Sequence, residues 1–255
     1  MRISVVTVCF NSEATVADTL ASVAAQDHPD YEHIVIDGYS SDGTMNVVKG
    51  HAGPRVRWVS EPDDGVYHAM NKGLWLATGD HVIFLNSDDY LARPDALSLA
   101  SRKLDETGAD CLFADTVFVR GDGRTPAGRV YSAHGFSKWW LRLGVMPPHP
   151  SMFMRRELAL ALEGFDTSYR ISADFDLIAR AVLKAGCSWA TLPSVLTKFR
   201  VGGLSTRGLA TKVALGREFA RSLSALGQPL AHLSVQLRYP IKAMQLLRRT
   251  SALTM

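Results

Sequence analysis

The chain has 255 residues, of which 47% are hydrophobic and 21% are charged. A chain of this length and composition folds into one large domain or two small ones, and an intrinsically disordered tail is excluded. The formal net charge is +3, yet residues 207–255 carry eight Lys and Arg against one acid, which leaves residues 1–206 with a net charge of −4. We therefore expect an acidic folded part followed by a basic extension.

Three cysteines, Cys9, Cys111 and Cys187, lie far apart in apolar surroundings. Their spacing matches neither a zinc site nor a disulfide framework, so we expect buried free thiols in a reducing compartment. The N-terminal residues form an apolar strand and lack the pattern of a signal peptide. Because no window holds about 18 uncharged apolar residues, the sequence predicts a cytoplasmic protein without a transmembrane span.

The first hundred residues alternate apolar runs with amphipathic segments of helical period. This pattern predicts strands at 3–8, 33–38, 56–61 and 81–85, with helices within 11–26, 41–51 and 64–79. Strands that alternate with helices of this length indicate an α/β fold, in which a mostly parallel central sheet is flanked by helices. Ligand sites in such sheets lie at the carboxyl ends of the strands.

The second half of the chain is more mixed. The pattern predicts strands at 111–119, 128–133, 187–192 and 195–201, an apolar aromatic segment at 136–146, and a helix at 172–186. From about residue 208 onward the pattern is helical. The chain contains no internal repeat and no low-complexity segment.

A cluster of mostly polar residues stands at the end of each of the four strands expected in the first half. These residues are Thr7, Phe10 and Asn11, then Asp37, then Asp64, and finally Ser87, Asp88 and Asp89. If the sheet is parallel, all of them meet along one edge. The last two are neighbouring carboxylates at the exit of an apolar strand, which suits a divalent cation that also binds substrate phosphates. Their alternative role is to cap the helix that follows, but the other polar strand ends favour the cation.

Several other side chains have both a functional and a structural interpretation. Asp174 and Asp176 share the first turn of the helix at 172–186, where either could be a general base and either could be a helix cap. Asp37 could accept a hydrogen bond from a nucleoside or close a turn. Lys72 could contact a phosphate or lie on a solvated helix face. Trp139 and Trp140 could stack on sugar rings or belong to the core.

Three separated segments carry a resemblance to a known family. They are ISVVTVCFNSEATVADTLASVAAQDHPDYEHIVIDGYSSDGT at 3–44, EPDDGVYHAMNKGLWLATGDHVIFLNSDD at 61–89 and ISADFDLIAR at 171–180. In this order they resemble inverting family 2 glycosyltransferases of the GT-A fold, of the type that builds bacterial polysaccharides. The resemblance implies a nucleotide-sugar donor, a divalent metal (Mn²⁺ or Mg²⁺), and inversion at the anomeric carbon.

The resemblance also assigns roles to single residues. The family's Asp-x-Asp metal motif falls on residues 86–88, where the first acid is Asn86, so Asp88 is the stronger metal ligand and the adjoining Asp89 the second. The catalytic base of the family falls on Asp174, which favours it over Asp176. The nucleoside-binding acid falls on Asp37, and Gly38 stands where many relatives have a second acid.

Further residues follow from the same resemblance. The expected contacts with the nucleotide-sugar are Thr7, Phe10, Asn11, Asp37, Asp64, Asn71, Lys72, Ser87 and Arg200, with Arg200 beside the diphosphate. His149 is expected to bind the acceptor or the pyrophosphate, with Trp139 and Trp140 on the acceptor side. The implied organisation is a catalytic domain over 1–206, with a nucleotide-sugar half at 1–100 and an acceptor half at 101–206, and a basic helical extension over 207–255.

Two other functions remain open at this point. A nucleotidyltransferase that makes nucleotide sugars would share the core and the metal acids, but the sequence lacks a Gly-rich loop with basic residues after the first strand. A non-catalytic sugar-binding module would not need Asp88, Asp89 and Asp174 together. A dinucleotide-binding dehydrogenase is not favoured, because no G-x-G-x-x-G follows the first strand, and no nucleic-acid partner is expected.

The basic end has two interpretations. Leu233, Leu237, Ile241 and Met244 recur at helical spacing among basic residues. Such a helix either packs on the catalytic domain or lies on an anionic membrane surface. The second interpretation would place the enzyme at the inner face of the membrane and suit a glycan or lipid-linked acceptor.

Overall fold

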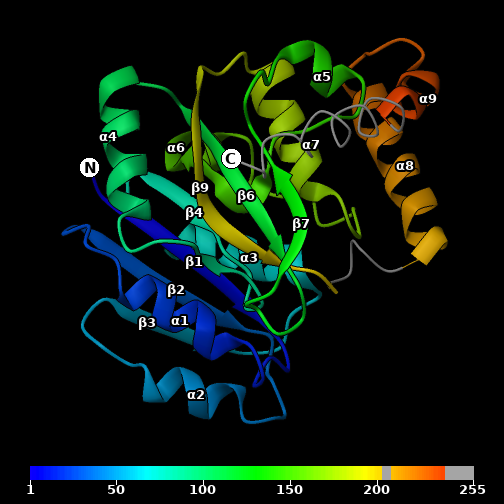
Figure 1. Ribbon diagram of the computed structural model, residues 1–255. Helices are drawn as coiled ribbons and strands as arrows, with labels where there is room; N and C mark the ends of the chain where they lie inside the picture. Colours follow the sequence, from blue (N-terminus) through cyan, green and yellow to red (C-terminus); the bar gives the residue numbers. More distant parts are fainter. Residues whose placement is uncertain (203–207, 239–255) are drawn as a thin grey trace.

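The computed structural model describes residues 1–202 and 208–238. Its centre is a sheet to which nine strands of the described part contribute, in the order β3-β2-β1-β4-β8-β6-β9-β5, with β7 paired to β6. Helices cover the sheet on both sides (Figure 1). The α/β fold class predicted from the sequence is therefore confirmed.

The first half of the sheet is parallel, as the alternating pattern predicts. Its strands are β1 (Ile3–Cys9), β2 (Tyr31–Asp37), β3 (Val56–Ser60) and β4 (His81–Phe84). The connecting helices are α1 (Val16–Ala24), α2 (Thr44–Gly50) and α3 (Val66–Leu76). Every residue of β1 and β2 is buried, because α3 packs on one face of these strands while α1 and α2 pack on the other. Burial on both faces explains their unbroken apolar pattern.

The second half adds antiparallel strands. Its strands are β5 (Tyr90–Leu91), β6 (Cys111–Val119), β7 (Pro126–Tyr131), β8 (Met152–Arg155) and β9 (Trp189–Arg200). Its helices are α4 (Ala96–Thr107), α5 (Lys138–Arg142), α6 (Arg156–Ala161) and α7 (Ala173–Ala179), which continues as a π-helical turn (Arg180–Lys184). Strand β8 lies antiparallel between β4 and β6 and so joins the two halves.

The two strands predicted at 187–192 and 195–201 are one strand, β9. Its pairing with β6 is irregular beside Pro193, where the register shifts. Proline has no N–H group to donate to the ladder, so it interrupts the hydrogen bonds without ending the strand. The three cysteines are buried and free, as predicted.

Helix α8 (Gly208–Ala225) begins the expected extension and packs on α7. The rings of Phe175 and Phe219 stack at 3.9 Å, and Phe219, Leu223 and Val235 belong to the main hydrophobic cluster. The short helix α9 (Ala231–Ser234) and a 3₁₀ turn (Val235–Leu237) follow. This part of the extension is therefore integrated into the main hydrophobic core.

Part of the predicted membrane helix can be located. Leu233 and Leu237 are exposed, whereas Ile241 and Met244 lie outside the described residues. Within the described ranges, no helix has both the length and the apolar character that crossing a bilayer requires.

Candidate active site

The carboxyl ends of β1, β2, β3 and β4 meet along one edge of the sheet, where the sequence analysis expects the site. Backbone hydrogen bonds continue beyond the strands and keep these exits side by side. Gly38 N–H donates to Cys9 O, Glu61 N–H to Asp37 O, and Ser87 N–H to Val8 O.

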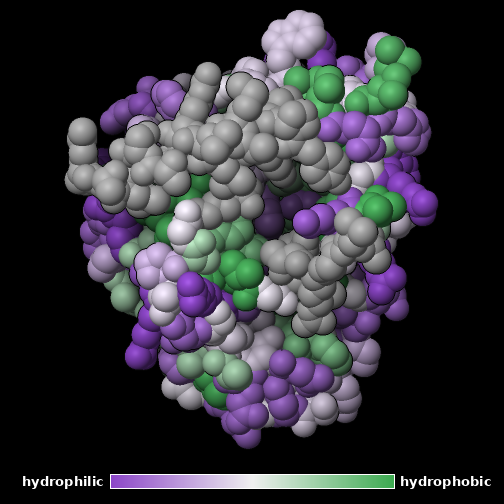
Figure 2. Space-filling model, turned by 45° about the vertical axis from the view of Figure 1, so that its right-hand side comes forward, coloured by the Kyte–Doolittle hydropathy of each residue, from purple (hydrophilic) through white to green (hydrophobic). Residues whose placement is uncertain are grey.

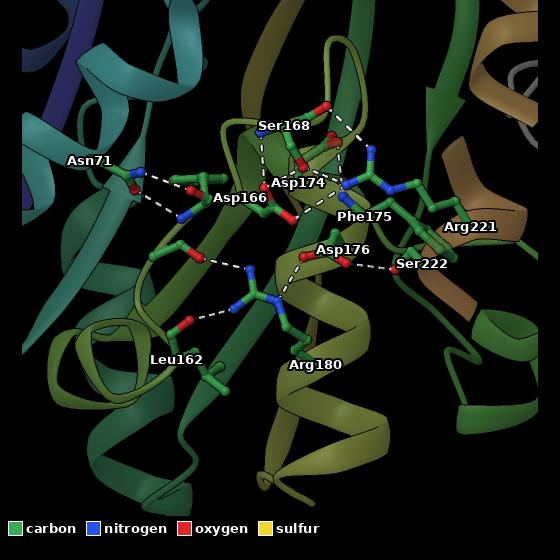
Figure 3. Close-up of polar contacts among 12 residues, drawn as sticks. Asn71, Leu162, Asp166, Ser168, Asp174, Phe175, Asp176, Arg180, Arg221 and Ser222 are labelled. Carbon is green, nitrogen blue, oxygen red and sulfur yellow. Dashed lines mark hydrogen bonds and ion pairs between the residues drawn. The ribbon is translucent and has the colours of Figure 1, made fainter. Parts of the chain in front are cut away.

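Two of the expected donor contacts lie inside the protein. Thr7 is fully buried, and its hydroxyl is hydrogen-bonded to His33 Nε2 at 2.9 Å. Asn71 is also buried, and its amide exchanges two hydrogen bonds of 2.8 Å with the backbone of Phe165 (Figure 3). Both side chains therefore hold the core together in this structure. The sequence pattern is misleading for Thr7 because this residue lies inside β1 and not at its end. Successive side chains of a strand point to opposite faces of the sheet, so the Thr7 side chain points to a buried face and does not reach the strand end.

Asp37 lies at the site but is completely buried. One of its carboxylate oxygens accepts the hydroxyl of Ser40, and the other accepts the hydroxyl of Ser60 at 2.6 Å and the backbone N–H of Ser40 at 3.1 Å. The Cys9 thiol also donates to Asp37 at 3.7 Å, so four donors fix the carboxylate among the exits of β1, β2 and β3.

Phe10 and Asn11 form the exit of β1. Phe10 is 64% exposed, whereas Asn11 adopts a left-handed backbone with φ of 48°. The Asn11 N–H donates to Ser40 Oγ at 2.8 Å, and its side-chain oxygen accepts the N–H of Ser41 at 2.9 Å. Asn11 therefore ties the exits of β1 and β2 together, and Phe10 projects toward solvent.

The exit of β3 differs from the expectation in one residue. Asp64 is exposed and pairs with His68 in the first turn of α3. Asp63, which also follows β3, lies directly against Gly38 of the β2 exit. Gly38 has no side chain, which leaves the space for this contact. Lys72 from α3 bonds Glu61 at 2.8 Å and so also lies at this exit.

The β4 exit presents the acids proposed for a metal. Burial raises the pKa of Asp88, and the positive charges of Arg200 and His149 offset part of this rise. Asp89 is fully buried, and its burial, together with the charge of Asp88, raises its pKa well above the usual range. Asn86 Oδ1 and Asp89 Oδ2 are buried oxygens without a hydrogen-bond partner.

These oxygens fit a hard divalent cation, which takes oxygen ligands and compensates buried carboxylates. Within residues 1–202 and 208–238, no three His, Cys, Asp or Glu side chains are grouped closely enough to hold a metal alone. A cation at Asp88 would therefore complete its shell with water and substrate phosphates. Ser87, the remaining residue here, is buried and donates its hydroxyl to Ser12 Oγ at 2.8 Å.

Arg200 connects β9 to the metal acids. Its backbone N–H donates to Asp89 Oδ1 at 3.0 Å, and its guanidinium pairs with Asp18 of α1 at 2.6 Å. Contact with a donor diphosphate, which the sequence analysis expects, would compete with Asp18 for this guanidinium.

Asp174 and His149 form a pair at the start of α7. His149 Nδ1 lies 3.1 Å from Asp174 Oδ2, and the backbone N–H of Phe175 donates to Asp174 Oδ1 at 2.8 Å. The 3₁₀ turn that carries His149 (His149–Ser151) precedes β8 and brings it to the first turn of α7. The carboxylate is thus oriented through both oxygens in the first turn of α7.

Asp176 has a different environment, although it shares that turn. It is buried, pairs with Arg180 Nε at 2.6 Å, and accepts the hydroxyl of Ser222 at 2.8 Å (Figure 3). Arg180 also donates to the carbonyls of Leu162 and Gly164. Asp176 is therefore part of a closed ion-pair network, and its position supports the choice of Asp174.

The two tryptophans expected on the acceptor side lie on α5. Trp139 is exposed, with the guanidinium of Arg142 5.0 Å from its ring centroid, whereas Trp140 is half-buried.

Comparison with known proteins shows which family and which fold the chain resembles. Residues 4–160 match the family described as glycosyl transferase family 2. An uncharacterized glycosyltransferase of Mycobacterium tuberculosis is 33% identical over 206 residues, which cover 80% of this chain and 77% of that protein. A PGL/p-HBAD biosynthesis glycosyltransferase of Mycobacterium bovis is 28% identical over 207 residues, which cover 79% and 78% of the two chains.

Two solved structures have a similar fold. A mannosyltransferase from Pyrobaculum calidifontis, in complex with GDP-Man and Mn²⁺, has a TM-score of 0.68 and 21% identity over 98% of this chain and 75% of its own. Residues 1–349 of TarS from S. aureus, in complex with UDP-GlcNAc, have a TM-score of 0.66 and 20% identity over 88% of this chain and 66% of that chain. Both likenesses support the GT-A fold. The chain therefore belongs to glycosyl transferase family 2 and is a glycosyltransferase.

Proposed function

We propose that this enzyme transfers a sugar from a nucleotide-sugar donor to a hydroxyl of a glycan or lipid-linked acceptor, with inversion at the anomeric carbon. The observation that carries the proposal is the geometry of Asp174, whose oxygens are fixed by His149 Nδ1 at 3.1 Å and Phe175 N–H at 2.8 Å. A carboxylate held in this way can remove the proton from an acceptor hydroxyl as that hydroxyl attacks the sugar. Inversion needs one displacement from the opposite face, so no covalent enzyme intermediate is required.

The donor side of the proposed site is the strand edge. Asp88, with Asp89 and Asn86 beside it, would hold a Mn²⁺ or Mg²⁺ ion. Such an ion, when bound, neutralises charge on the leaving nucleoside diphosphate. Lys72 lies beside the exit of β3 and supplies a positive charge there. The two related structures hold UDP-GlcNAc and GDP-Man with Mn²⁺, which makes such donors reasonable first candidates.

We also propose a two-part catalytic domain, in which residues 1–100 bind the donor and residues 101–206 bind the acceptor.

We further propose that the protein lies on an anionic membrane surface. Leu230, Leu233 and Leu237 of the α9 region are 72%, 65% and 52% exposed, although they are apolar. A lipid-linked acceptor would be reached from that surface. These leucines, with the basic charge of residues 207–255, support the membrane proposal.

A panel of UDP-, GDP- and dTDP-sugars, with and without Mn²⁺, tests the function through release of the nucleoside diphosphate. We expect one nucleotide to support release, and the metal to be required. Pyrophosphate formation from a sugar phosphate and a nucleoside triphosphate would favour a nucleotidyltransferase instead. Sugar binding without release of any nucleotide would favour a non-catalytic module.

A further inference from the structure

The acid that the family resemblance assigns to nucleoside binding, Asp37, is fully engaged by the protein. Its carboxylate accepts the hydroxyls of Ser40 and Ser60 and the N–H of Ser40, and the residue has no exposed surface. A nucleobase that took one of these positions would leave a buried hydroxyl without a partner, which costs free energy. The polar recognition of a base at this edge therefore requires another side chain.

Asp63 has the geometry that Asp37 lacks. Its Oδ1 accepts the N–H of Gly65 at 2.9 Å, which fixes the side chain just before α3. Its Oδ2 lies over Gly38, where a Cβ atom at position 38 would come within 2.8 Å of it. Glycine at 38 thus leaves the space that the Asp63 carboxylate enters. Within residues 1–202 and 208–238, no hydrogen-bond donor of the protein reaches Oδ2.

Two aromatic rings flank the same exits. Phe10 follows β1 and Tyr39 follows β2, and they are 64% and 67% exposed. Tyr39 has a left-handed backbone with φ of 67°, which is uncommon for a residue other than glycine. Exposed aromatic rings of this kind stack on nucleobases. The exits of the neighbouring strands β1, β2 and β3 therefore bring two stacking surfaces to the same edge as one fixed hydrogen-bond acceptor.

We propose that Asp63 Oδ2, rather than Asp37, reads the nucleobase of the donor, with Phe10 and Tyr39 as the stacking surfaces. This inference rests on the proposed nucleotide-sugar function. An ionised carboxylate only accepts hydrogen bonds, so it pairs with N3–H of uracil or thymine and with N1–H of guanine. Cytosine and adenine lack this ring N–H, because their N3 and N1 carry lone pairs, and they can offer the carboxylate only an exocyclic amino group at a different position on the ring. The substrate class is therefore a uridine, thymidine or guanosine diphosphate sugar.

Calorimetric titration of the full chain with UDP, GDP and CDP tests the assignment without sugar transfer. We expect the wild type to bind UDP or GDP at least about tenfold more tightly than CDP, as one well-placed hydrogen bond predicts. Asp63→Asn keeps an oxygen for the Gly65 N–H but presents an amide to the base. It should weaken the preferred nucleotide by about tenfold and bring its affinity close to that of CDP.

The direction in which Asp63→Asn changes the nucleotide affinities distinguishes base recognition by Asp63 from two other roles, a nearby negative charge and a purely structural turn residue. If Asp63 were only a nearby negative charge, its removal would strengthen the binding of every anionic nucleotide. If it were only a turn residue, the affinities for UDP, GDP and CDP would fall together. A second variant, Gly38→Ala, should reduce the same selectivity because its Cβ displaces Oδ2.

Asp30→Asn is the matched control, since Asp30 precedes β2 at the opposite end of the sheet and contacts Arg2 at 3.9 Å. It should bind all three nucleotides as the wild type does. Unchanged selectivity in both Asp63→Asn and Gly38→Ala would overturn the assignment of Asp63 alone. A wild type that binds neither these three nucleotides nor dTDP would overturn the proposed function together with it.

Discussion

Glu218 on α8 accepts two hydrogen bonds from Ser172, one from its backbone N–H at 3.0 Å and one from its hydroxyl at 2.7 Å. The same carboxylate accepts the backbone N–H groups of Arg170 and Ile171 at 3.0 and 3.1 Å. Ser172 precedes α7, and Asp174 follows two residues later. The single acid of the basic segment 207–255 therefore fixes the loop that leads into α7, the helix that carries the proposed base.

The first prediction concerns this loop. Glu218→Gln leaves one acceptor oxygen where the loop offers four donors, so the turn before α7 should loosen. We expect kcat to fall by about tenfold, and the free energy of unfolding to fall by about 1–3 kcal/mol, the usual cost of unpaired buried donors. The affinity for a nucleoside diphosphate should stay unchanged. Arg217→Ala, on the exposed neighbouring residue, is the control, and equal kcat values for Glu218→Gln and the control would contradict the positioning role.

The second prediction separates the two acids of α7. Asp174→Asn should lower kcat by about 10²–10⁴, the usual contribution of a positioned proton transfer, while nucleotide affinity is kept. Asp176→Asn should have a much smaller effect on kcat but should lower the melting temperature, because Arg180 would lose its carboxylate partner. Steady-state rates and thermal unfolding of both variants check this. A larger rate loss at position 176 would reverse the assignment.

The third prediction concerns the metal. Asp88→Ala should abolish transfer with little loss of stability, because burial raises the pKa of this carboxyl and its ionised form is costly without a cation. Asp89→Ala should also lower stability, since Asp89 accepts the backbone N–H of Arg200. Wild-type turnover and unchanged Mn²⁺ dependence in Asp88→Ala would show that the metal binds elsewhere.

The parallel half of the sheet and its site edge could be predicted because they follow from local periodicity. Buried strands and helices alternate in the sequence, and the carboxyl-end rule then locates the polar clusters. The contact of Glu218 with Ser172 joins residues 46 positions apart, and no local pattern reports it. For the same reason α8 reads as a separate basic extension, although its apolar face, with Phe219 and Leu223, belongs to the main core.

The fine assignment of site residues could be predicted only in part. Motif position selects Asp174 over Asp176, and the ion pair of Asp176 with Arg180 supports that choice. Motif position also selects Asp37, but it does not indicate that the hydroxyls of Ser40 and Ser60 already donate hydrogen bonds to the Asp37 carboxylate. Burial and hydrogen-bond saturation depend on neighbours from other strands, so they appear only once the chain is folded.

The fourth prediction concerns acid stability. His33 is buried beside Thr7, and burial lowers its pKa to about 3, so the folded protein keeps it neutral. The unfolded chain binds a proton here below about pH 6.5, so this contribution to stability is complete above that pH and falls as the pH drops toward 3. We expect a loss of about 1.4 kcal/mol for each pH unit from this group. His33→Gln should show a shallower decline in denaturant titrations between pH 6.5 and 4, and an equal slope would contradict the assignment.

The last prediction concerns the end of the described chain. Leu230, Leu233 and Leu237 are exposed beside a segment rich in Lys and Arg. Figure 2 shows a few hydrophobic side chains among hydrophilic ones at the upper right of the molecule. Apolar side chains that enter the lipid interface, together with basic residues that contribute about 1 kcal/mol each near an anionic surface, would hold the protein there reversibly.

We therefore expect the chain to sediment with vesicles that contain phosphatidylglycerol at low salt, and to be released at high salt because the surface charge is screened. The double variant Leu233→Glu, Leu237→Glu should stay in the supernatant while its melting temperature is kept, since both side chains are exposed. The exposed Val213→Glu on α8 serves as the control for an added acid. If the wild type stays in the supernatant at low salt, the membrane proposal fails. The exposed leucines would then have to be explained by contacts within the protein or with another chain.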